Sequence, residues 1–135
     1  MRTIVPMRIV ADTNTFIAVA LNEPEKGKII RLTKGHDLIS PDVLPFEIGN
    51  ALTAMMKKNA LKKEEVTPAW EIVQQIPVDL RYTNIKSALR IAIEFNIYAY
   101  DAYFLECADN LKSPLLTLDI GMQRVAREIG ITILE

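Results

Sequence analysis

The chain has 135 residues but only one cysteine, Cys107, and one histidine, His36. A single cysteine excludes a disulfide within the chain and fits the reducing environment of the cytoplasm. One histidine is too few for a zinc site built on paired histidines, and a Ser-His-Asp triad could use only His36. We therefore expect any metal in this protein to be held by oxygen.

Long apolar runs are also missing. No stretch approaches the roughly 18 residues of a membrane span, so we expect no membrane association. The apolar part of the N-terminal "MRTIVPMRIVADTN" is too short for a signal peptide. The hydrophobic share is 50%, the charged share 24% and the formal net charge −1, values ordinary for a globular protein. At this length we expect residues 1–135 to form one domain.

Short apolar strands alternate with helical patterns along the chain. Strands are predicted at "MRIVA", "HDLIS", "PVDL", "PLLTL" and "ITIL", the second stopped by Pro41. In "VTPAWEIVQQI", Thr67 suits an N-cap and Pro68 the first helical position, and another helix is expected to end at Asn96. The alternation predicts an α/β fold with a central parallel sheet covered on both faces.

Two acidic residues fall inside apolar stripes of predicted helices. In "PDVLPFEIGNALTAMM", Glu47 lies three residues after Leu44 and four before Ala51, and Asp101 lies three residues before Phe104 on the apolar face of a later helix. A carboxylate on a buried face is costly unless it has a partner. A buried Arg or Lys beside Glu47, or capping of its own helix by Asp101, would explain each of them without any function.

Two further acids end predicted strands, Asp12 in "MRIVAD" and Asp119 in "LLTLD". Ligands bind at the carboxyl ends of strands in parallel α/β sheets, although each residue alone could be a helix N-cap. Four carboxylates meeting there would repel one another unless a cation lay among them. Mg²⁺ or Mn²⁺ prefers such ligands and activates water for phosphodiester hydrolysis. The pattern therefore predicts a metal-dependent phosphodiesterase.

The segments "VADTN", "SPDVLPFEIGNAL", "YAYDAYFLECA" and "LLTLD" resemble, in order, the four acidic motifs of the PIN domain family. The resemblance covers almost the whole chain and is strongest to the short VapC-type toxins of toxin–antitoxin systems. It implies a three-layer α/β/α sandwich with a central parallel sheet, and a Mg²⁺- or Mn²⁺-dependent endoribonuclease. The metal-binding and catalytic tetrad that it implies is Asp12, Glu47, Asp101 and Asp119.

The resemblance also implies roles for two polar residues and a set of partners. Thr117 would steer a water on the metal and Asn14 would help orient Asp12, although backbone hydrogen bonding explains both residues as well. The implied partners are an RNA substrate, a second copy of the chain in a homodimer, and an antitoxin protein that blocks the acidic cleft. The sequence departs from the family in two ways. The segment before Met7 is longer than in many members, so Met7 is an alternative start of the protein. Some members have a second acid soon after the position of Asp119, and its absence here leaves a second metal without that ligand.

Other functions stay open. "DTNT" resembles the DxDxT motif of haloacid-dehalogenase phosphatases, which favours a phosphohydrolase or phosphoacceptor domain using Asp12, but Asn14 stands where the second acid belongs. A PIN nuclease of RNA processing outside any toxin system is a further alternative. A PIN fold that only binds partners would require a damaged tetrad. The choice of RNA over DNA rests on the family, because no aromatic-rich motif for stacking unpaired bases is present.

Overall fold

The computed structural model describes residues 5–135, so the choice of Met1 as the start lies outside the described residues. Its strands are β1 (Arg8–Ala11), β2 (Asp37–Pro41), β3 (Asp79–Arg81) and β4 (Leu115–Leu116). Its helices are α1 (Thr13–Ala20), α2 (Lys26–Thr33), α3 (Leu44–Lys57), α4 (Val66–Gln74), α5 (Ile85–Phe95), α6 (Ala99–Leu111) and α7 (Ile120–Ile129), with a 3-10 turn, η1 (Lys63–Glu65), before α4.

The strands form one parallel sheet in the order β3-β2-β1-β4. Both Ile9 and Val10 of β1 are fully buried, as expected for a central strand of a parallel sheet. Ile9 packs in a cluster with Ala18 of α1 and Ile29 of α2, whereas Val10 belongs to the larger core cluster. Successive side chains of a strand point to opposite faces, so the sheet has a core on each side.

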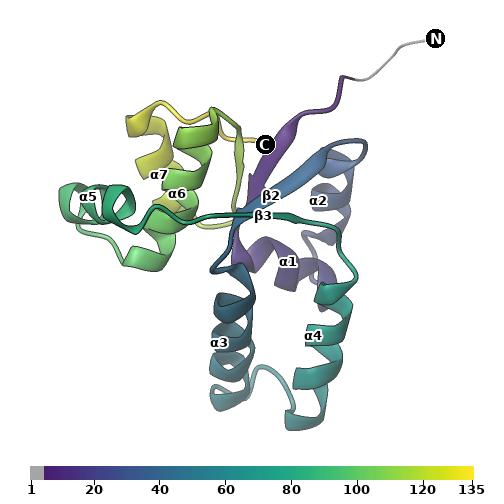
Figure 1. The fold of residues 1–135 in the computed structure, drawn as a ribbon. Coiled ribbons are helices and arrows are strands. Elements are labelled where there is room, and N and C mark those ends of the chain that lie inside the picture. The colour runs from purple at the N-terminus through teal and green to yellow at the C-terminus, as the bar shows by residue number, and fades with distance from the viewer. Residues whose placement is uncertain (1–4) are drawn as a thin grey trace.

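Helices cover both faces of the sheet. Helix α6 packs against β1 and β2 and also against α5 and α7, while α1 packs against α2, α3 and α4. Figure 1 shows α5, α6 and α7 gathered on one side of the sheet and α1 and α2 on the other, with α3 and α4 extending away together. The predicted three-layer α/β/α sandwich with a central parallel sheet is confirmed. Within residues 5–135, none of the helices has the length and apolar character to cross a bilayer.

Three local predictions need correction. Thr67 is not the N-cap of α4; it lies inside the first turn because η1 already winds the chain, and Glu65 is the N-cap. Pro41 is the last residue of β2 rather than the residue after it. The segment "ITIL" makes only an isolated bridge, from Ile133 to Leu115, because the two-residue β4 offers little edge for pairing. Asn96 does end α5 in the left-handed conformation, with φ 54°.

Candidate functional site

One small cavity, about 80 Å³ in volume, is lined by all four predicted acids. Asp12 directly follows β1 and Asp119 follows β4 after a short loop, so both lie at the carboxyl edge of the sheet. Glu47 and Asp101 belong to the first turns of α3 and α6. The lining also includes Thr13, Asn14, Ala51, Phe104 and Met122. The fold therefore brings together the acids that the sequence singled out, while their chemical roles stay a prediction.

Asp12 is the most deeply buried of the four acids, with 4% of its surface exposed. Its Oδ1 accepts hydrogen bonds from the Thr15 backbone N–H at 3.2 Å and the Thr15 hydroxyl at 2.8 Å. Its Oδ2 accepts one from the Thr117 hydroxyl at 2.5 Å. Burial raises the pKa of Asp12, and these hydrogen bonds, which lower it, only partly offset the effect. The carboxylate is thus held in one orientation at a position where its charge is costly.

The alternative explanation of these acids as helix N-caps holds for Asp12 and Asp119 and fails for Asp101. Asp12 caps α1, and Asp119 caps α7 by accepting a hydrogen bond from the Met122 backbone N–H at 3.1 Å. Both nevertheless line the cavity, so capping and a functional role are compatible. Asp101 does not cap α6, because the N-cap of that helix is Tyr98.

No Lys or Arg among the residues that the structure describes lines the acidic cavity. In the described part of the chain, the ion pairs are Arg81–Asp79, Lys112–Asp109 and Arg127–Glu135. None of these residues lines the cavity, so the expected alternative of a buried Arg or Lys paired with Glu47 is wrong. Burial, and then the charges of the other three acids, raise the pKa of Asp101 to about 6. A nearby cation would relieve this repulsion.

The donor set fits a hydrated divalent cation better than a bare one. Carboxylate oxygens are the ligands that Mg²⁺ and Mn²⁺ prefer. Across residues 5–135, however, no three Asp, Glu, His or Cys side chains are grouped closely enough to hold an ion by themselves. Mg²⁺ usually takes one or two carboxylates directly and keeps several waters. Thr13 also lines the cavity, and its buried hydroxyl has no hydrogen-bond partner among the described residues.

The structure shows where Thr117 and Asn14 lie relative to the four acids. Thr117 is buried and does not line the cavity; its hydroxyl donates to Asp12 and accepts from the Asp119 backbone N–H at 3.1 Å. It therefore links the two acids at the strand ends, and its expected role toward a water on the metal stays a prediction. Asn14 is exposed and lines the cavity, yet no hydrogen bond joins it to Asp12 within the described residues. The orienting role expected of Asn14 falls to Thr15 and Thr117.

Two threonines of the site, Thr13 and Thr15, were not predicted from the sequence. Thr15 had a recognisable signal, because it lies three residues after Asp12, the spacing at which a first-turn residue meets the N-cap. Thr13 had none, since only the packing around α1 shows that its hydroxyl lacks a partner.

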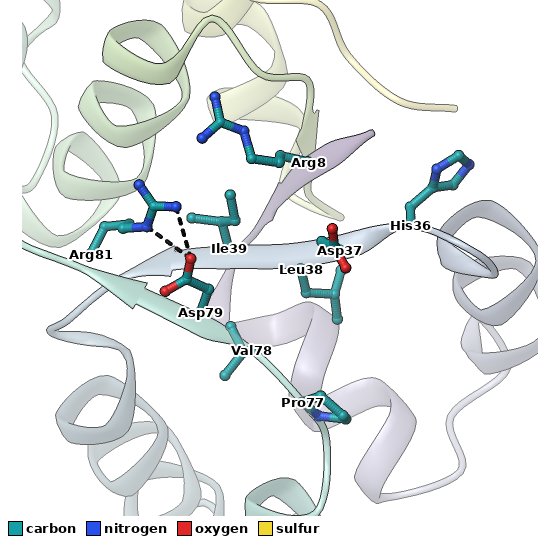
Figure 2. Close-up of a pocket in the computed structure, with 9 residues that line it drawn as sticks. All are labelled: Arg8, His36, Asp37, Leu38, Ile39, Pro77, Val78, Asp79 and Arg81. Carbon is teal, nitrogen blue, oxygen red and sulfur yellow. Dashed lines mark hydrogen bonds and ion pairs between the residues drawn. The ribbon is translucent and has the colours of Figure 1, made fainter. Parts of the chain in front are cut away.

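A larger cavity, about 510 Å³ in volume, lies at the amino-terminal edge of the sheet (Figure 2). It is lined by Arg8, His36, Asp37, Leu38, Ile39, Pro77, Val78, Asp79 and Arg81. Figure 2 shows the ion pair of Arg81 with Asp79, whose closest N–O distance is 2.8 Å. Two arginines and two aspartates balance in charge here, so this cavity lacks the uncompensated charge of the acidic one.

Comparisons with known proteins connect this geometry to a family. The family model described as the PIN domain matches residues 9–128, a range that includes all four acids of the cavity. The chain is also similar to a protein named Ribonuclease VapC3 from Pyrobaculum aerophilum. The two are 24% identical over 118 residues, which is 84% of this chain and 90% of that protein.

Two solved structures share the fold. The crystal structure of PAE2754 from Pyrobaculum aerophilum has a TM-score of 0.67 at 19% identity, and the match covers 90% of this chain and 87% of that one. A chain of VapBC2 from Rickettsia felis, bound to a DNA fragment from the promoter, has a TM-score of 0.66 at 16% identity, covering 96% of this chain and 98% of that one. With the family model matched over nearly the whole length, this chain belongs to the PIN domain family.

Proposed function

We propose that this protein is a Mg²⁺- or Mn²⁺-dependent endoribonuclease and the toxin of a toxin–antitoxin pair. The observation that carries the proposal is the convergence of four carboxylates on one cavity that no Lys or Arg of residues 5–135 lines. Membership of the PIN domain family and the similarity to a protein named Ribonuclease VapC3 support RNA as the substrate. The likeness to a chain of VapBC2 supports pairing with an antitoxin.

The proposed mechanism assigns a task to each acid. Asp12, Asp101 and Asp119 would hold the cation, in part through water, and Glu47 would join them or accept the proton of the attacking water. When bound, the cation lowers the pKa of a water and stabilises the charge that develops on the phosphate and on the leaving oxygen. Thr15 and Thr117 hold Asp12 in a fixed orientation before any ligand arrives. The products would carry 5′-phosphate and 3′-hydroxyl ends.

The test is cleavage of total RNA, with the new ends mapped by sequencing. We expect new 5′-phosphate ends in Mg²⁺ and in Mn²⁺, none in EDTA, and recovery when excess Mg²⁺ is added back. Total RNA is the appropriate substrate because a selective enzyme can ignore a short synthetic one. Cleavage that persists in EDTA would contradict the proposal. A phosphorylated Asp12 trapped in place of RNA cleavage would favour the phosphohydrolase or phosphoacceptor alternative.

We also propose a homodimer, because α5 presents an apolar stripe to solvent. Ile85, Leu89 and Ile93 follow one another at helical spacing and are 52%, 42% and 81% exposed. Contiguous exposed apolar surface of this kind marks protein interfaces. Light scattering after size-exclusion chromatography should give twice the chain mass of 15.2 kDa, and Ile93→Lys should shift the protein to the monomer. A wild-type protein that elutes as a monomer at micromolar concentration would argue against the dimer.

We further propose that the protein works in the cytoplasm, and the free, buried Cys107 supports this location.

A further inference from the structure

Four lysines gather where α3 ends and η1 begins, in the segment "KKNALKK". Lys57, Lys58, Lys62 and Lys63 are all exposed, and together we call them the lysine tip. Figure 1 shows this corner at the end of α3 and α4 that lies farthest from the sheet. A helix C-terminus attracts cations, which accounts for Lys57 and Lys58 but not for the two lysines at the start of η1.

No carboxylate of the described residues pairs with the lysine tip. Every ion pair within residues 5–135 lies outside this segment. The nearest acids in the sequence are Glu64 and Glu65, which the four lysines outnumber. The Oε1 of Glu65 accepts a hydrogen bond from the Lys62 backbone N–H at 2.9 Å, so this carboxylate closes the η1 turn instead of binding a lysine side chain. The positive charges of the tip are therefore available to an anion in solution.

Helix α3 connects the lysine tip to the acidic cavity. Glu47 and Ala51 line that cavity and lie four residues apart on one face of the helix. Ala54 and Lys58 continue this row at spacings of three and four residues. At 1.5 Å per residue, Glu47 and Lys58 are about 16 Å apart along the helix axis. An anionic chain that leaves the cavity along this face, where the side chains of Ala51 and Ala54 are small, would reach the lysine tip.

We propose that the lysine tip binds the sugar–phosphate backbone of a single-stranded RNA whose scissile phosphate lies at the acidic cavity. The proposal rests on the proposed function and adds an RNA-binding surface to it. Lysine side chains bind phosphates without regard to sequence, and the release of counterions makes such binding depend steeply on salt. The carboxylates of the cavity repel RNA when no cation is bound, so affinity for the RNA chain has to come from a positive surface elsewhere on the molecule.

The test measures the binding of a labelled single-stranded RNA oligonucleotide by fluorescence anisotropy at several salt concentrations, in EDTA so that the RNA stays intact. The tip variant combines Lys57→Gln, Lys58→Gln, Lys62→Gln and Lys63→Gln. We expect it to bind about tenfold more weakly than the wild type at about 0.1 M salt. The slope of log affinity against log salt should fall by about 2 to 3, the value for four lost contacts to a single strand. Because these side chains are exposed, the melting curve should stay close to that of the wild type.

The matched control removes the same charge from α2 and its C-cap, which contribute no lining residue to the acidic cavity in the described part of the chain. It combines Lys26→Gln, Lys28→Gln, Arg31→Gln and Lys34→Gln. This variant should bind RNA within about twofold of the wild type. In Mg²⁺, the tip variant should have a raised KM for RNA and an unchanged kcat, since the lysines lie away from the reacting phosphate.

Three results would overturn the proposal. The first is a tip variant with the RNA affinity and salt dependence of the wild type. The second is a loss of equal size in the α2 control, which would mean that net charge alone sets the affinity. The third is a wild-type protein that does not bind the oligonucleotide at low salt. A wild-type protein that binds RNA through the tip but does not cleave it in Mg²⁺ or Mn²⁺ would contradict the proposed function and leave the binding surface intact, so the two failures are distinguishable.

Discussion

The Asp12→Asn protein should cleave RNA at least about 100-fold more slowly than the wild type while keeping its fold. An amide oxygen in place of Oδ1 can still cap α1 and accept from Thr15. The amide nitrogen in place of Oδ2 can neither accept from the Thr117 hydroxyl nor bind a cation. The substitution therefore removes the charge and one proposed ligand atom from the acid of the cavity that accepts the most hydrogen bonds.

The fold should tolerate this change because Thr117 has an alternative. Its hydroxyl can accept from the new amide and turn its proton toward the Met122 sulfur, 3.8 Å away. The lost charge was one that burial already disfavoured. Single-turnover cleavage rates and circular-dichroism melting curves measure the two effects separately. Glu128→Gln, which removes an exposed acid of α7 outside the cavity, is the matched control and should cleave at the wild-type rate. A cleavage rate for Asp12→Asn within about twofold of the wild type would contradict the assigned role.

Asp101→Asn should act in opposite directions on activity and on stability. Cleavage should fall by about 10- to 100-fold, because a ligand acid is lost. In metal-free buffer at pH 7 the variant should unfold at a higher temperature than the wild type. The pKa of Asp101 is raised from 3.8 to about 6 by burial and by the charges of its acidic neighbours. The folded state therefore disfavours the ionised carboxyl, and an amide escapes that cost.

The pH dependence gives the sign of this effect. Between about pH 4 and pH 6 the folded protein binds more protons at Asp101 than the unfolded chain does, so stability falls as pH rises through that range. Melting temperatures of the wild type in EDTA should follow this fall, and those of Asp101→Asn should follow it less steeply. Asp12, whose pKa is also raised by burial, contributes in the same direction in both proteins. Glu94→Gln, an exposed acid of α5, should show the wild-type slope. If the melting temperature of Asp101→Asn fell with pH as steeply as that of the wild type, ionising Asp101 would carry no electrostatic cost in the folded protein.

The convergence of the four acids was predictable from residue types and spacing. Two of them follow parallel strands, whose carboxyl ends share one edge of the sheet, and β1 and β4 are indeed neighbours. The positions of Glu47 and Asp101 in apolar stripes gave the helical faces that turn toward this edge.

The hydrogen bonds around these acids were not predictable in the same way. Thr117 lies 105 positions from Asp12, and its contact with Asp12 depends on the exact register between β1 and β4. The start of α4 was misplaced because Thr67 and Pro68 are good local signals for a helix start, whereas the preceding 3-10 turn has no strong sequence signature. The residue types and their local spacing thus indicated which acids line the cavity, and tertiary packing determined which residues hydrogen-bond to them.

The capping of α1 by Asp12 has a consequence for how the protein responds to a ligand. The oxygen that holds the first helical turn belongs to the same carboxylate that lines the cavity, and Thr13 and Asn14 of that turn line it too. Occupying the cavity and winding this turn are thus thermodynamically linked, since a ligand that steadies the carboxylate also steadies the helix start. Backbone amides at the beginning of α1 should report occupancy through slower hydrogen exchange, even where no side chain of the turn touches the ligand.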